Sequence, residues 1–189
     1  MVPDVLHEDG VHVSRLITET LPLASSAGPP VPPTLNDEGS SMATIAPKHV
    51  RLLSHAEART ALDAALAKAE EIGVPSSVAV IDAGRDLVAF GRQDDAQLIT
   101  AEVAINKAYT ARSVNGPSSQ LEEATKATGP FWGLQHGVSG RLVTFGGGFP
   151  IILDGFVVGA IGVGGGSVEQ DVEVAQAGLA ALGSAEAQQ

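Results

Sequence analysis

The glycines of the run "FGGGFPIILDGFVVGAIGVGGGS", residues 145–167, are the first candidates for chemistry. Gly146, Gly147 and Gly148 stand at the expected end of a strand, where backbone N–H groups without side chains around them can bind an anion. They either line a pocket for an anionic or planar ligand, or form a bulge and tight turn that serve packing alone. The run lacks the Lys of a phosphate loop, and its hairpin context excludes a dinucleotide fingerprint.

Lys107, in the segment "INKAYTA", is the cation that could act together with this glycine run. It either points into solvent, as most lysines do, or points at the glycines and holds the carboxylate of a ligand. Thr110 lies one helical turn further on the same face and could supply a hydroxyl group, and Asn106 lies nearby. Asp82 is most simply a turn residue, and the alternative for it is a general base.

The five histidines form no HxH or HxxxH pair, so their spacing gives no sign of a zinc site. The chain also contains no cysteine, which excludes thiolate metal sites and disulfides. His55, at the start of an expected helix, and His136, in a later loop, are the histidines of interest. The alternative for each is an ordinary surface histidine.

Helix and turn signals predict the elements that must position these residues. Ser54 and Glu57 form a capping box for a helix that ends at Gly73, and a second helix spans about residues 98–113. The segment "SSVAVIDAGRDLVAFGRQ" between them is typical of a β-hairpin.

Three further strands are expected at residues 142–145, 150–153 and 156–163, and the last two are joined by the Asp154 and Gly155 turn. A final helix is expected over residues 168–182. Strands that follow one another through short turns predict a five-stranded antiparallel sheet with helices packed on it.

Composition and charge restrict the partners of the protein. The net charge of −11 argues against binding to nucleic acid, because phosphate contacts require clustered Lys and Arg. The longest apolar stretch, residues 156–163, is too short to span a membrane, and the N-terminus lacks the pattern of a signal peptide. We therefore expect a soluble, cytoplasmic protein.

Pro, Ser and Gly enrichment sets the first part of the chain apart. Residues 1–46 are expected to form an arm, flexible or docked on a neighbouring subunit, and Met42 is an alternative start. Residues 47–189 are expected to form one domain.

Several segments together resemble the HbpS- and GlcG-like proteins, which are often described as haem-degrading or haem-binding. They include "LSHAEARTALDAALAKAEEIGVPSSVAVIDAGRDLVAFGRQDDA", "KAYTARSVNGPSSQL", "FGGGFPI" and "GFVVGAIGVGGG". The resemblance covers about residues 50–184. It implies a profilin-like α/β/α fold with a five-stranded antiparallel sheet in the order 2-1-5-4-3 and helices on both faces. It also implies a homo-oligomer built from dimers, up to an octamer.

The resemblance implies function less directly, because relatives bind haem, are fused to cobalamin adenosyltransferases or stand in catabolic operons. A haem-binding relative uses a histidine of its N-terminal helix, and His55 lies near that place. The chain also departs from the family, which commonly has a Met-Asp-Gly run where residues 93–95 read Gln-Asp-Asp.

The expected function is therefore to bind a small ligand, haem or another planar molecule that bears carboxylates. The haem iron would be the metal, held by His55 or His136. The predicted binding residues are His55, His136, Asn106, Lys107, Thr110, Gly146, Gly147 and Gly148. The alternative is an enzyme or accessory factor that acts on a small carboxylate in a catabolic pathway, with Lys107, Asp82 and His136 as catalytic candidates. A purely structural oligomer is a third interpretation, and the sequence leaves open whether the protein is an enzyme.

Overall fold

The computed structural model of the protein describes residues 51–184, so the predicted arm at residues 1–46 lies outside the described part. Residues 51–184 form five α-helices, a 3-10 helix and four strands. In chain order they are α1 (His55–Glu71), β1 (Ser77–Asp82), β2 (Leu87–Arg92), α2 (Ile99–Val114), the 3-10 helix η2 (Ser118–Leu121), α3 (Glu122–Thr125), α4 (Leu134–Gly137), β3 (Gly148–Leu153), β4 (Phe156–Gly164) and α5 (Val168–Ala181).

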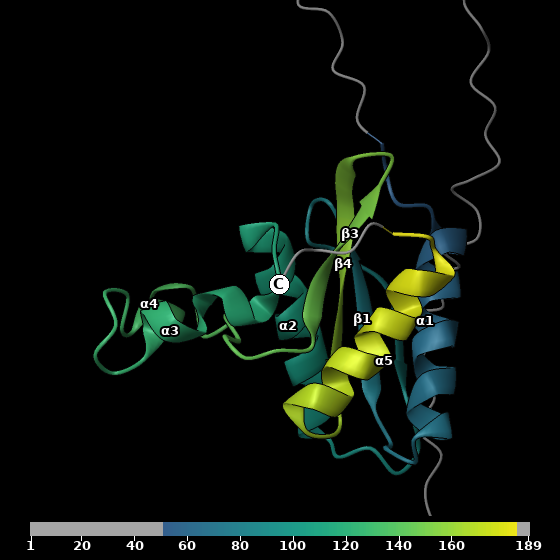
Figure 1. Ribbon diagram of the computed structural model, residues 1–189, viewed down its shortest axis with the longest axis horizontal. Coiled ribbons are helices and arrows are strands. Elements are labelled where there is room, and N and C mark those ends of the chain that lie inside the picture. Colours follow the sequence, from purple (N-terminus) through teal and green to yellow (C-terminus); the bar gives the residue numbers. More distant parts are fainter. Residues whose placement is uncertain (1–50, 185–189) are drawn as a thin grey trace, which may run out of the picture. The chain divides into compact units, whose positions relative to one another are not determined.

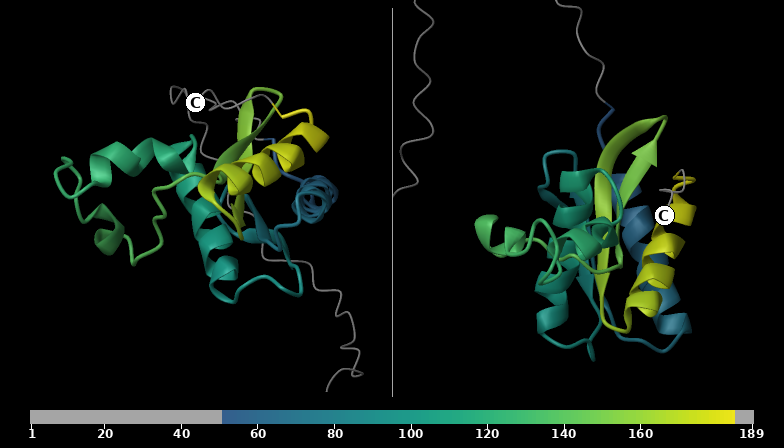
Figure 2. Two further views of the ribbon diagram at one scale, coloured as in Figure 1. Left: turned by 60° about the horizontal axis from the view of Figure 1, so that its bottom comes forward. Right: turned by 60° about the vertical axis from the view of Figure 1, so that its left-hand side comes forward.

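The strands form one antiparallel sheet in the order β2-β1-β4-β3. α1 and α5 pack against each other on one face of the sheet, and α2 covers the other face (Figures 1 and 2). The predicted α/β architecture, with helices on both faces of an antiparallel sheet, is consistent with this arrangement.

The prediction of five strands, in the order 2-1-5-4-3, is wrong, because residues 142–145 do not form a strand. Side-chain hydroxyl groups bind the backbone of this segment instead. The Val143 N–H donates to Thr110 Oγ1 at 2.9 Å, and Ser118 Oγ donates to the carbonyl of Phe145 at 2.6 Å. The neighbouring strand β3 is left at the edge of the sheet, a position that suits Pro150 because proline has no N–H for a further ladder.

The turns and caps follow the sequence closely. Asp154 and Gly155 join β3 to β4 with φ values of 53° and 78°, as a two-residue hairpin turn requires. A capping box at Ser167 and Gln170 starts α5, in the same way as the one at Ser54 and Glu57 starts α1. Local side-chain chemistry therefore fixes where these elements begin.

The start of α1 is further stabilised by Arg51, whose guanidinium contacts Glu57 Oε1 at 2.6 Å. Hydrogen bonds from Arg51 and from Ser54 lower the pKa of Glu57 to about 2. A carboxylate with a lowered pKa stabilises the fold above its unfolded pKa, and this contribution is lost as the pH falls through the folded value.

Ser54→Ala is expected to lower the free energy of unfolding by about 1 kcal/mol at pH 7. In Glu57→Gln, the free energy of unfolding should decrease less steeply as the pH is lowered from about 4.5 to 2, because the group that takes up the proton is gone. Urea unfolding at several pH values measures both effects. Glu70→Gln, an exposed change near the other end of α1, is the control. If it reduces the pH dependence of stability as much as Glu57→Gln does, the pH dependence does not come from Glu57.

Candidate functional site

A buried ion pair joins the two helix layers at the start of β3. Lys107 of α2 and Asp171 in the first turn of α5 contact each other through Nζ and Oδ2 at 2.5 Å. Their side chains are 0% and 5% exposed, although they come from helices on opposite faces of the sheet. The second carboxylate oxygen of Asp171 accepts the N–H of Gly166 at 3.0 Å, so both of its oxygens have partners.

Burial decides the electrostatics of this pair. The loss of hydration lowers the pKa of Lys107, because it disfavours the charged ammonium, and the Asp171 carboxylate opposes this effect. The Lys107 ammonium also lies 4.9 Å from the centroid of the Phe145 ring, within the range of a cation–π contact. The charge of Lys107 is therefore balanced inside the protein.

Gly147 and Gly148 lie directly beside Lys107, and whether Lys107 also holds a ligand carboxylate stays a prediction. A Cβ atom at Gly147, whose φ is +104°, would lie 2.7 Å from Lys107 Nζ and 2.8 Å from Asp171 Cβ. A Cβ atom at Gly148 would lie 2.4 Å from the Lys107 carbonyl oxygen. All three glycines, Gly146 included, are buried, and the Gly148 N–H donates to Ser118 Oγ at 3.1 Å. Gly147 makes room for the pair and Gly148 for the backbone of Lys107, and the contact of the glycines with a ligand stays a prediction.

The Thr110 side chain binds backbone groups, and Asn106 takes part through its own backbone carbonyl. The Thr110 hydroxyl donates to the Asn106 carbonyl at 2.8 Å and accepts the N–H of Val143. Thr110 is fully buried and Asn106 is partly exposed. Thr110 thus holds the segment that leads into the glycine run.

The two candidate histidines are both exposed. His55 is the first residue of α1. His136 belongs to α4, in a segment (residues 122–141, the projecting segment) that extends away from the sheet in Figure 1. The same segment carries Phe131 and Trp132, which are 57% and 70% exposed.

Asp82 ends β1, and its Oδ1 accepts the N–H of Asp86 at 3.0 Å within the hairpin turn. Within residues 51–184, no hydrogen bond or ion pair joins the catalytic candidates Lys107, Asp82 and His136. The same part of the chain contains no group of three or more His, Asp or Glu side chains that could hold a metal ion.

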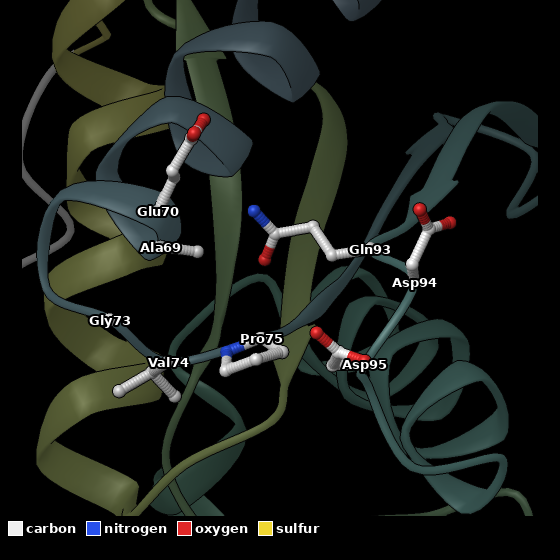
Figure 3. Close-up of a pocket in the computed structure, with 8 residues that line it drawn as sticks. All are labelled: Ala69, Glu70, Gly73, Val74, Pro75, Gln93, Asp94 and Asp95. Atoms are coloured by element: carbon white, nitrogen blue, oxygen red, sulfur yellow. The ribbon is translucent and has the colours of Figure 1, made fainter.

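A cleft of about 460 Å³ lies between the end of α1 and the segment that follows β2 (Figure 3). Its side chains include the carboxylates of Glu70, Asp94 and Asp95. Gln93 extends across it toward α1 and is fixed there, because its Oε1 accepts the Ser76 N–H and its Nε2 donates to the Leu66 carbonyl. None of the predicted ligand-binding residues lines this acidic cleft.

Asp171 is the residue that the sequence analysis missed. It precedes the buried residues Val174, Ala175 and Gly178 by three, four and seven positions, so it lies on the apolar face of α5. A carboxylate at such a position requires a buried cation as partner, and this signal points to Lys107. No helix in the described residues has the length and apolar character needed to cross a membrane.

Comparison with known proteins identifies relatives along almost all of the described chain. The chain is 38% identical over 132 residues to an uncharacterized 15.0 kDa protein of the dhaT-dhaS intergenic region of Citrobacter freundii, covering 70% of this chain and 93% of that protein. It is 35% identical over 130 residues to the corrinoid adenosyltransferase PduO of the same organism, covering 69% of this chain but only 39% of PduO.

Among solved structures, a PduOC:haem complex matches with a TM-score of 0.70 and 33% identity, covering 73% of this chain and all of that one. The model of the family described as "Haem degrading protein HbpS-like" matches residues 53–180. This match spans every helix and strand from α1 to β4 and nearly all of α5. The predicted resemblance is thus confirmed, and the chain belongs to the HbpS-like family.

Proposed function

We propose that the protein binds a small ligand, and that this ligand is haem. The observation that carries the proposal is the similarity to the PduOC:haem complex, which extends over the whole length of that chain. The family description supports the same ligand class. The similarity to PduO does not extend to the adenosyltransferase as a whole, because the match spans only 39% of it.

The side chains present suit haem. An exposed imidazole can ligate the iron, and His55 and His136 are both exposed. His136 also shares the projecting segment with Phe131 and Trp132, whose exposed rings offer an apolar surface for a porphyrin. Bound haem would supply an iron centre, while the chain supplies the imidazole and the apolar contacts.

Lys107 contributes to this proposal as a scaffold. Its ammonium is paired with Asp171, and this pair joins α2 to α5 beside Gly147. Thr110 acts in the same way on residues 142–145 through the N–H of Val143.

Haemin titrations of the wild type, His55→Ala and His136→Ala test which imidazole ligates the iron. Loss of the ligating imidazole should shift the Soret band and weaken binding at least tenfold, or about 1.4 kcal/mol. The other variant serves as the matched control and should behave as the wild type. If neither variant changes the Soret band or the affinity, histidine ligation is wrong.

We also propose that the protein forms a homo-oligomer built from dimers. Exposed apolar side chains on the projecting segment support this, since burying them would stabilise an interface. A cytoplasmic location and a role in catabolism stay predictions. The enzyme alternative finds no specific support, because no hydrogen bond or ion pair joins its three candidate residues in the described chain.

A further inference from the structure

Two arginines lie over the ring of Tyr109 near the end of α2. The guanidinium carbon of Arg85, from the turn between β1 and β2, lies 4.7 Å from the ring centroid. That of Arg141, the last residue of the projecting segment, lies 3.9 Å from the same centroid. Arg85 Nη1 also donates to the Tyr109 hydroxyl at 3.0 Å. Three segments far apart in sequence thus bring two positive charges to one ring.

These charges are not balanced by carboxylates. Within residues 51–184, every lysine forms an ion pair, as do Arg51 and Arg59, whereas Arg85, Arg92, Arg112 and Arg141 have no acidic partner within 4.0 Å. This is notable in a chain whose net charge is −11. Two like charges held near each other repel, and an anion between them would remove that repulsion.

The backbone at Arg85 is in a conformation that side chains rarely adopt. Its φ is +76°, in the left-handed region that favours Gly, Asn or Asp. A long charged residue at such a position suggests that its side chain, rather than the turn, accounts for its presence.

A third arginine adds an unsatisfied donor on the same helix. Arg112 follows Tyr109 by three residues, so the two side chains start on neighbouring positions of one helix face. The Arg112 Nε is buried and has no hydrogen-bond partner, whereas its Nη1 donates to Asn115 Oδ1 at 2.6 Å. The C-terminal end of a helix attracts cations, and this attraction explains part of the cluster. It does not explain the strained backbone of Arg85 or the presence of two guanidinium groups on one ring.

We propose that Arg85, Tyr109 and Arg141 form a binding site for a small organic anion with a carboxylate or phosphate group. Guanidinium groups bind both groups through paired N–H donors. The Tyr109 hydroxyl accepts from Arg85, so its own proton is available to donate to the anion. The site is independent of the proposed haem function and is tested without haem.

The single tyrosine of the chain makes a direct experiment available. The full-length protein, with tyrosine selectively labelled with ¹³C, is titrated with inorganic phosphate and separately with succinate, each against sodium chloride of equal ionic strength. The Tyr109 ring resonance should move saturably with one or both anions and not with chloride. A response to phosphate alone or to succinate alone assigns the anion group.

Variants determine whether the arginines hold the anion. Arg85→Gln and Arg141→Gln should each weaken binding by at least about tenfold, because each removes a charge-assisted contact. Arg92→Gln is the matched control, because Arg92 also has no acidic partner and lies at the far end of the hairpin. Circular dichroism confirms that all variants are folded. A resonance that responds equally to chloride, or equal affinities in all variants, would overturn the proposal.

Discussion

Asp171→Asn is expected to lower the free energy of unfolding by about 3–5 kcal/mol, because it leaves the Lys107 ammonium buried without a counter-charge. The wild-type pair is separated by 2.5 Å and its side chains are almost inaccessible to solvent. Asparagine keeps the shape of the aspartate but has one acceptor oxygen instead of two, so the change removes the charge and the acceptor of either Lys107 or Gly166. Urea unfolding at neutral pH measures the loss.

Two further variants sharpen this prediction. Lys68→Ala breaks ion pairs with Glu71 and Glu173, whose carboxylates are both exposed, and it should reduce stability much less than Asp171→Asn does. Replacing both Lys107 and Asp171 by apolar residues of similar size should recover much of the stability that the single change removes. Equal decreases in the free energy of unfolding for Asp171→Asn and Lys68→Ala would show that the buried pair stabilises the fold no more than an exposed pair does.

Gly162→Ala is expected to lower the free energy of unfolding by about 3 kcal/mol, at the upper end of the range for overpacking. A Cβ atom there would lie 2.2 Å from the carbonyl oxygen of Ala104 and 2.5 Å from the amide nitrogen of Ala108. Both are backbone atoms of α2, so the whole helix would have to move away from β4. Chemical denaturation and the melting temperature both report this change.

Gly137→Ala is the control for the glycine prediction. A Cβ atom at Gly137 would meet nothing within 4 Å, and its φ is not positive. This change should therefore alter stability by no more than about 0.5 kcal/mol. If Gly162→Ala is equally mild, glycine at position 162 does not serve the close approach of α2 to the sheet.

Local signals in the sequence predicted most of the fold. The capping box at Ser54 and the Asp154 turn depend on residues within a few positions of one another, and the structure has both. The stretch 142–145 was misjudged because its partners are distant hydroxyl groups. Thr110 and Ser118 bind its backbone, and no periodicity within the segment reveals them.

The surroundings of Lys107 were predicted only in part. Its position beside the glycine run was one of two stated interpretations, but its partner Asp171 is 64 residues away in sequence. Spacing along a chain does not give such distances, because only the packing of α2 and α5 at the edge of β3 brings the two residues together. The cluster of Arg85, Tyr109 and Arg141 was missed for the same reason.

The proposed function is tested most directly by an equilibrium titration of the wild-type, full-length protein with haemin, followed by the Soret band. We expect a band that is shifted from that of free haemin and saturates at a defined number of haems per chain. An absorbance that rises linearly with haemin and matches a protein-free blank would contradict haem binding.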